Sequence, residues 1–220
     1  MTASEIKTEV LKAAEADKLE QYKKFFQCFP GGYGDGDSFA GIRNPVLRSA
    51  SRNYQHISLD TLFELFTDPI HEIRLLSMFI MELKYKNKKT PDTERELMVR
   101  FYLDHLDYVN NWDLVDSSAP HVLGAWAYHH QSETLFQLAE SPNLWKNRVA
   151  MLACYYYIRM NSFNVPIKIA EKLLSHKHDL IHKAVGWMLR EIGNRNFEAE
   201  LGFLKKTLPR HSPNSVAVCH

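Results

Sequence analysis

Cysteine is scarce in this chain of 220 residues, and none of its three cysteines has a near neighbour of its kind. Cys28, Cys154 and Cys219 form no CxxC pair, which argues against a disulfide framework, a zinc ribbon and an iron–sulfur cluster. No stretch approaches the roughly 18 uncharged apolar residues that a membrane span requires. The first 26 residues also lack the apolar core of a signal peptide. We therefore expect a cytoplasmic protein with no membrane segment.

Net charge is also nearly absent, at +1 for the whole chain, but the two parts of the chain differ in sign. Residues 141–220 contain 12 Lys/Arg and five Asp/Glu, a net charge of +7. The preceding 140 residues contain 15 and 21, a net charge of −6. A basic half on a neutral chain indicates a polyanionic partner such as DNA, although chance clustering on solvated helix faces gives the same pattern.

Alternating strand patterns are missing, and helical periodicity dominates the chain. Residues 2–29 are expected to form one or two helices. The segment PGGYGDGDS, residues 30–38, is the most Gly-rich part of the chain and is expected to be a loop. It lacks the Gly-Lys-Ser/Thr ending of a phosphate-binding P-loop, so it does not indicate a nucleotide site.

Four helical segments look alike, and each carries an apolar stripe. They are residues 71–86, 111–126, 144–159 and 178–193. The step from Asp116 to Arg148 is 32 residues, and the step from Arg148 to Lys183 is 35. Such periods indicate stacked helix pairs, each too small to bury its apolar face alone. The sequence therefore predicts an all-α fold, a right-handed α-α superhelix of HEAT-like repeats with a concave face.

Tryptophan stands beside a charged residue in three of these segments, at helical spacing. The groups are Trp112 with Asp116, Trp145 with Arg148, and Trp187 with Lys183 and Arg190. A single tryptophan is more often a core residue, but a core face does not normally admit such charged partners. Asp113 lies about a quarter turn away from this face and is expected to cap or brace its helix.

This combination suits the cleavage of an N-glycosidic bond to an alkylated purine. The base is then a cationic leaving group, and positive charge develops on the sugar. A carboxylate about 4 Å away gains on the order of 4 kcal/mol at an effective dielectric constant of ~20, which corresponds to about a thousandfold in rate. Tryptophan faces attract cations and polarised C–H groups, and arginine or lysine would hold the flanking phosphates.

Other motifs are weaker. His178 and His182 are four residues apart, but no HExxH arrangement surrounds them, and residues at a helix start explain them better than a metal site. Ser117 and Ser118 have no GxSxG context, which argues against a serine hydrolase. We expect neither a metal ion nor a cofactor.

At this point the residues resemble a known family, the AlkD-like DNA alkylation repair glycosylases, which are built of HEAT-like repeats. The similarity spans roughly residues 21–195 and keeps the order and spacing of its motifs. The matching segments are QYKKFF, PGGYGDGDSFAGIRNPVLR, VNNWDLVDSSAPHVLG, LWKNRVAMLACYYYIR and HDLIHKAVGWMLREIG.

The resemblance implies a role for individual residues. The catalytic acid of the family's WDxVD motif corresponds to Asp116, and its two sugar-facing tryptophans correspond to Trp112 and Trp187. Its backbone-binding arginines correspond to Arg148 and Arg190, and its N-terminal helix tyrosine to Tyr22. Lys183 joins the DNA-binding set through its spacing.

The implied activity is release of positively charged N3- and N7-alkylpurines, such as 3-methyladenine and 7-methylguanine, from double-stranded DNA without a base-flipping pocket. None of the lysines shares the face of Trp112 and Asp116, so we expect hydrolysis by a monofunctional, monomeric glycosylase. The alternative is a non-catalytic HEAT-like module that binds DNA or a protein.

The chain departs from the family at its C-terminus, which reads LPRHSPNSVAVCH from Leu208. The family's last helix is expected to be lost or replaced by a disordered tail. We expect a single HEAT-like domain over residues 1–208, containing the Gly-rich loop 30–38, and an atypical tail over residues 209–220.

Overall fold

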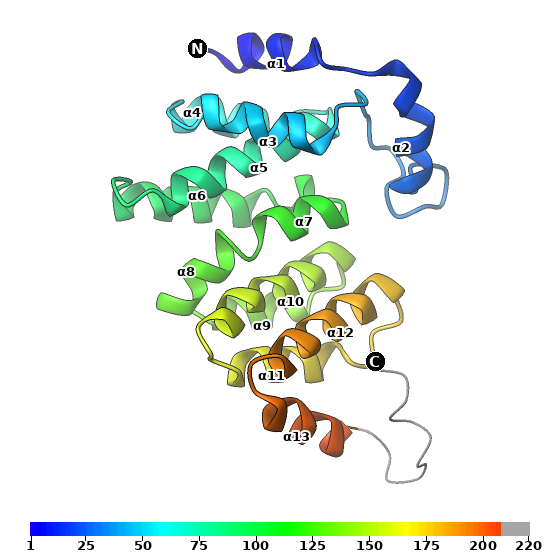
Figure 1. Cartoon of the computed structure of the whole chain (residues 1–220), viewed down its shortest axis with the longest axis vertical. Coiled ribbons are helices and arrows are strands. Elements are labelled where there is room, and N and C mark those ends of the chain that lie inside the picture. The colour runs from blue at the N-terminus through cyan, green and yellow to red at the C-terminus, as the bar shows by residue number, and fades with distance from the viewer. Residues whose placement is uncertain (208–220) are drawn as a thin grey trace. The chain divides into compact units, whose positions relative to one another are not determined.

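The computed structural model describes residues 1–207, and this part of the chain is helical. Its one β feature is an isolated parallel bridge between Ser38 and Ile70, and no strand occurs among the described residues. The prediction of an all-α fold is confirmed. Figure 1 shows the helices in chain order, from blue at the N-terminus to orange-red at the end of the described range.

The first of two compact units covers Met1–Leu123. Its helices are α1 (Ala3–Leu11), α2 (Leu19–Phe25), α3 (Asn44–Asn53), α4 (Leu59–Phe66), α5 (His71–Lys86), α6 (Asp92–Asp104) and α7 (Trp112–Ser118), with short 3₁₀ turns at Ala16–Lys18 and Leu106–Tyr108.

The second unit begins at Gly124, just inside helix α8 (Leu123–His129). Its other described helices are α9 (Glu133–Ala139), α10 (Leu144–Arg159), α11 (Asn164–Leu173), α12 (Asp179–Gly193) and α13 (Phe197–Thr207).

Each unit is organised around one helix that is buried on nearly every side. In the first unit, all eleven residues from His71 to Met81 of α5 are buried, and α5 packs against α3, α4, α6 and α7. In the second unit, Asn147 to Cys154 of α10 are buried, and α10 packs against α9, α11 and α12. A helix that is buried on nearly every side lies in the middle of its unit, and the polar side chains that such a helix carries must find partners inside the protein.

Side chains cap several of these helices. Thr2 and Glu5 form a reciprocal capping box at the start of α1, and Ser58 accepts from the backbone N–H of Thr61 in α4. Asn143 accepts from the backbone N–H groups of Trp145 and Lys146 at the start of α10. Such caps satisfy N–H groups that have no partner inside a helix, so they fix where each helix begins.

The Gly-rich segment 30–38 is a loop, as predicted, and it lies between α2 and α3. Gly31 and Gly36 adopt φ angles of 83° and 82°, a left-handed conformation that favours glycine. The loop ends against α5, where the backbone N–H of His71 donates to the carbonyl oxygen of Ser38 over 2.8 Å.

The predicted helical segments are largely confirmed. Segments 71–86 and 144–159 are α5 and α10, and segment 178–193 is α12 with one extra residue. Segment 111–126 is different, because it contains both α7 and the start of α8, with a break at residues 119–122. Pro120 lies in that break, and its ring cannot donate the hydrogen bond that a continuous helix needs.

Among residues 1–207, no helix is both long enough and apolar enough to span a membrane. The predicted tail over residues 209–220 lies outside the described residues. The right-handed superhelix and the single domain concern the arrangement of the whole chain and stay predictions.

Candidate active site

Helix α7 carries Trp112, Asp113 and Asp116. Asn111 is buried at its N-terminus, where its side chain accepts from the backbone N–H of Trp112 over 2.8 Å. Trp112 and Asp116 are both half-buried, whereas Asp113 is buried together with Leu114 and Val115. The helix therefore turns Trp112 and Asp116 to a partly accessible side and turns Asp113 to the interior.

An aromatic cluster surrounds Trp112. The ring of Phe26 stacks on Trp112 with centroids 5.4 Å apart, and Phe25 meets Trp112 edge-on at the same distance. Phe26 also stacks on Phe39 at 5.0 Å and meets Tyr22 edge-on at 6.0 Å. Phe26 thus connects Tyr22 to Trp112, two residues that lie 90 positions apart in the sequence.

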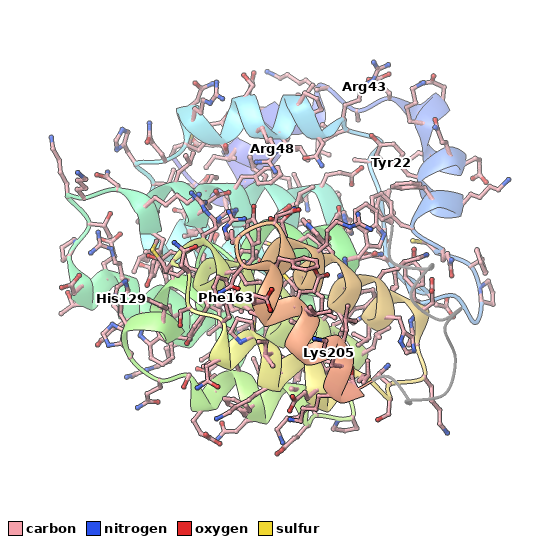
Figure 2. The ribbon with its side chains drawn as sticks, turned by 60° about the horizontal axis from the view of Figure 1, so that its bottom comes forward. Tyr22, Arg43, Arg48, His129, Phe163 and Lys205 are labelled. Atoms are coloured by element: carbon pink, nitrogen blue, oxygen red, sulfur yellow. The ribbon has the colours of Figure 1, made fainter. Side chains whose placement is uncertain are left out.

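Tyr22 projects from α2 and is labelled in Figure 2. Its hydroxyl group donates to the carbonyl oxygen of Ile42 over 3.3 Å, just before α3. Burial and the negative charges of Glu72 and Glu15 raise the pKa of Tyr22. The tyrosine is therefore a neutral, oriented part of this aromatic cluster at physiological pH.

A cavity of about 170 Å³ lies beside the cluster, wholly within the first unit. Eleven residues line it: Tyr22, Phe25, Phe26, Phe39, Ile42, Asn44, His71, Glu72, Leu75, Trp112 and Asp113. Most of its wall is aromatic or aliphatic, and its buried polar groups already have partners. Both carboxylate oxygens of Glu72, for example, accept backbone N–H groups of residues 40–42 at 2.8–3.1 Å.

In the wall of the cavity, His71 joins the Gly-rich loop to α7. Its Nδ1 lies 2.8 Å from a carboxylate oxygen of Asp37, and its Nε2 lies 2.8 Å from a carboxylate oxygen of Asp113. The side chains of His71 and Asp37 are only 1% and 2% exposed. Phe39 stacks on the imidazole at 4.5 Å, and Phe26 packs against it at 5.0 Å.

Arg74, one turn further along α5, completes this network. Its Nη2 donates to both carboxylate oxygens of Asp37 at 2.8 and 2.9 Å, and to the side-chain oxygen of Asn110 at 2.9 Å. Its Nε donates to the carbonyl oxygen of Tyr108. The first turns of α5 therefore hold both the Gly-rich loop and the turn that leads into α7.

The network favours a charged histidine. Burial alone would lower the pKa of His71, but the charges and hydrogen bonds of Asp113 and Asp37 raise it to about 9. Burial would raise the pKa of Asp37, whereas its hydrogen bond from His71 and the charge of Arg74 lower it below the ordinary value. At neutral pH the cluster thus contains an imidazolium between two carboxylates.

In the second unit, helix α12 presents Lys183, Trp187 and Arg190 on one exposed face. Trp187 is 41% exposed and approaches Tyr155 with ring centroids 6.2 Å apart. Lys183 forms an ion pair with Asp179 one turn earlier, at 2.6 Å, and both side chains are largely exposed. Such a surface pair contributes little to stability and leaves the lysine available to another anion.

Arg148 has a different environment from the other predicted DNA-binding residues. It is 6% exposed, and its Nη1 donates to the carbonyl oxygen of Leu180 at 2.7 Å. The guanidinium therefore braces the first turn of α12 from inside the second unit. Whether it also contacts a phosphate stays a prediction.

The structure thus groups the predicted residues by unit. Tyr22, Trp112 and Asp116 belong to the first unit, and Arg148, Lys183, Trp187 and Arg190 belong to the second. Four residues of this region were not predicted as site residues: Phe26, Asp37, His71 and Arg74. A signal for the last two was present, because charged residues interrupt an otherwise apolar segment at the start of α5. Among residues 1–207, no three His, Cys, Asp or Glu side chains are grouped so as to hold a metal ion.

Comparisons with known proteins bear on the family and the fold. A family model described as "DNA alkylation repair enzyme" matches residues 6–217. The fold is similar to a solved structure described as a predicted DNA alkylation repair enzyme from Enterococcus faecalis, with a TM-score of 0.66 and 17% sequence identity. That similarity covers 91% of this chain and 92% of the other. A comparison with curated proteins gives no significant match.

Proposed function

The chain belongs to the DNA alkylation repair enzyme family, and on this premise we propose that it is a monofunctional DNA glycosylase. Its substrates would be cationic N3- and N7-alkylated purines in double-stranded DNA, including 3-methyladenine and 7-methylguanine. The observation that carries the proposal is the pairing of Trp112 and Asp116 on the half-buried side of α7. A protein that serves only as a scaffold has no need of a carboxylate beside an aromatic cluster on this partly accessible side of α7.

In the proposed reaction, the bond between C1′ of the sugar and the ring nitrogen of the base breaks. The bonding electron pair leaves with the base, which becomes neutral, and positive charge develops on the sugar. A water molecule then adds to C1′ and loses a proton, so an abasic site and a free alkylpurine result. The chemistry needs a fixed negative charge and a water molecule, and it requires no metal ion or cofactor.

Asp116 would provide that negative charge. A carboxylate about 4 Å from the sugar cation is worth on the order of 4 kcal/mol at an effective dielectric constant of ~20. If this interaction develops only in the transition state, it contributes about a thousandfold in rate. Trp112, fixed by stacking on Phe26, would offer its ring to the polarised sugar, and Trp187 is proposed to do the same.

The exposed face of α12 would bind the DNA backbone. Lys183 and Arg190 lie on this face, in the part of the chain with a net charge of +7. Phosphate contacts of this kind position a protein on DNA and carry no sequence information. We propose that Tyr22 and Arg148 assist, Tyr22 from within the aromatic cluster and Arg148 through its support of α12. The protein is proposed to act without a base-flipping pocket, as a cytoplasmic monomer.

The alternative is a protein that binds DNA without excising a base, and the exposed basic face of α12 favours it as a second candidate. A single-turnover assay separates the two. Excess protein is incubated with methylated duplex DNA, and released 3-methyladenine and 7-methylguanine are quantified. Release above the spontaneous rate supports the glycosylase, whereas binding of the same DNA without release supports the non-catalytic module.

A further inference from the structure

The buried imidazole of His71 links Asp37 of the Gly-rich loop directly to Asp113 of helix α7. We propose that His71 and Asp37 are positioning residues, which act through Asp113 to hold Trp112 and Asp116 in the orientation that base release requires. This inference rests on the proposed glycosylase function. It also assigns a role to the loop 30–38, which would serve as the outer support of the candidate active site.

The geometry of His71 requires a charged ring. Both of its nitrogen atoms lie 2.8 Å from carboxylate oxygens, and ionised carboxylates can only accept hydrogen bonds. A neutral imidazole has one N–H group, so one of the two carboxylates would then face a nitrogen lone pair. The aromatic rings of Phe26 and Phe39 pack against the imidazole, and the His71 side chain is only 1% exposed.

Helix α7 depends on such external support. It has only seven residues, and a helix this short is marginal without tertiary contacts. Asp113 lies in its first turn, directly after Trp112 and three residues before Asp116. A change in the position of Asp113 therefore moves both candidate catalytic side chains.

The charges around His71 are balanced only while it is protonated. Asp37 faces it from the loop and Asp113 from α7, and Arg74 neutralises Asp37 from the next turn of α5. Loss of the imidazolium proton leaves two buried carboxylates with one cation. Glu72, which also lines the cavity, accepts backbone N–H groups of residues 40–42. Burial raises the pKa values of Tyr22 and Cys28, that of Cys28 to about 11.

The test compares His71→Gln and Asp37→Asn with Ile80→Val. Ile80 is fully buried on the same helix α5, so its truncation perturbs the core without touching the network. The experiment measures single-turnover release of 3-methyladenine from pH 7 to pH 10. The dissociation constant for the same DNA and the melting temperature are determined for each variant.

We expect wild-type release to be constant near neutral pH and to fall above about pH 9. His71→Gln and Asp37→Asn should be at least tenfold slower at pH 7.5, with DNA affinity within about twofold of wild type. The alkaline decrease should be lost in His71→Gln and kept in Ile80→Val. Wild-type release in His71→Gln, or an unchanged alkaline decrease in that variant, would overturn the inference.

Two further measurements cover the cases in which a variant does not fold or no base is released. The imidazole of His71 is titrated in the wild type by NMR, and its midpoint must coincide with the decrease in release. If the wild type releases no base, the proposed function fails, and hydrogen exchange of residues 112–118 then decides the positioning role. Reduced protection in Asp37→Asn, but not in Ile80→Val, supports it, and equal protection in both refutes it.

Discussion

Arg148 on α10 donates a hydrogen bond from Nη1 to the carbonyl oxygen of Leu180 at the first turn of α12, over 2.7 Å. The guanidinium is nearly inaccessible, so this contact stabilises the packing of two helices inside the second unit. The same residue was predicted from sequence to hold a phosphate. Because Arg148 is buried, we expect its substitution to lower the stability of the protein before it affects any contact with DNA.

Arg148→Ala should therefore lower the free energy of unfolding by about 2 kcal/mol, which is typical of a hydrogen bond made by a charged group. DNA affinity should fall as well, because the first turn of α12 loses its support. Urea unfolding and DNA binding are measured on the same preparation. Normal stability combined with weaker DNA binding would show that Arg148 acts mainly on phosphate.

Arg190→Ala should behave in the opposite way. Arg190 is exposed on α12, and substitutions at exposed positions usually change stability by no more than about 0.5 kcal/mol. If Arg190 contacts a phosphate, the slope of log K against log salt should become shallower by about 0.9. Lys172→Ala is the control, since Lys172 is an exposed cation on α11 that pairs with Glu140. An unchanged slope in Arg190→Ala would remove Arg190 from the proposed DNA-binding face.

Gly186→Ala should stabilise the protein. Gly186 lies inside α12, and a methyl group added there meets no atom within 4 Å. Alanine is better than glycine in a helix by about 0.5–1 kcal/mol, so the melting temperature should rise by about 1–4 °C. Gly202→Ala, on α13, is equally unobstructed and should raise it similarly.

These two variants should differ in DNA binding. Gly186 lies next to Trp187 and between Lys183 and Arg190 in the sequence, so its methyl group would stand on the proposed phosphate-binding face. We expect weaker DNA binding for Gly186→Ala and unchanged binding for Gly202→Ala. Equal binding by both variants would mean that DNA does not approach α12 closely at this position.

The sequence was sufficient to predict the long helices and the composition of one exposed face. Helices α5, α10 and α12 begin and end within one residue of the predicted segments, because apolar stripes and polar breaks are local signals. Lys183, Trp187 and Arg190 share a face because helical spacing requires it. The break between α7 and α8 was not predicted, although Pro120 was a visible signal for it.

The support of α7 could not be predicted in the same way. Asp37, His71 and Asp113 come from a loop and two helices, and no periodic pattern relates their positions. The burial of Arg148 is likewise a tertiary effect, since its charge alone favours an exposed position. Only the packing of the helices brings these groups to their partners.

The stability of the protein should decrease in mildly alkaline solution. The pKa of His71 is about 9 in the folded protein, above the ordinary value of 6.5. The charged His71 therefore contributes fully to the free energy of unfolding below pH 6.5. This contribution, about 3 kcal/mol in total, is lost as the pH rises through 9. Urea unfolding at pH 6.5, 8 and 9.5 measures this loss, and His71→Gln should flatten the profile. An equal decrease in that variant would assign the effect to another group.

Asp116→Asn should abolish base excision while the fold and DNA binding remain. The amide keeps the shape of the side chain but removes the negative charge that would face the developing sugar cation. The expected loss is about 2–4 kcal/mol of transition-state stabilisation, or roughly thirty- to a thousandfold in rate. DNA binding should be unchanged or slightly tighter, because one repulsion with phosphate is removed. Single-turnover release of 3-methyladenine measures the rate, and thermal melting checks the fold.

Asp113→Asn is the matched control on the same helix. Asp113 is buried and accepts a hydrogen bond from His71, so the amide breaks a buried ion pair and should cost about 3–5 kcal/mol of stability. Its loss of activity should therefore accompany a large decrease in melting temperature, whereas Asp116→Asn should lose activity at a nearly normal melting temperature. Trp187→Ala should also slow release, to a smaller extent, through a lost contact with the sugar. If Asp116→Asn excises at the wild-type rate while a folded Asp113→Asn does not, the reaction uses the other carboxylate, and the assignment of Asp116 is wrong.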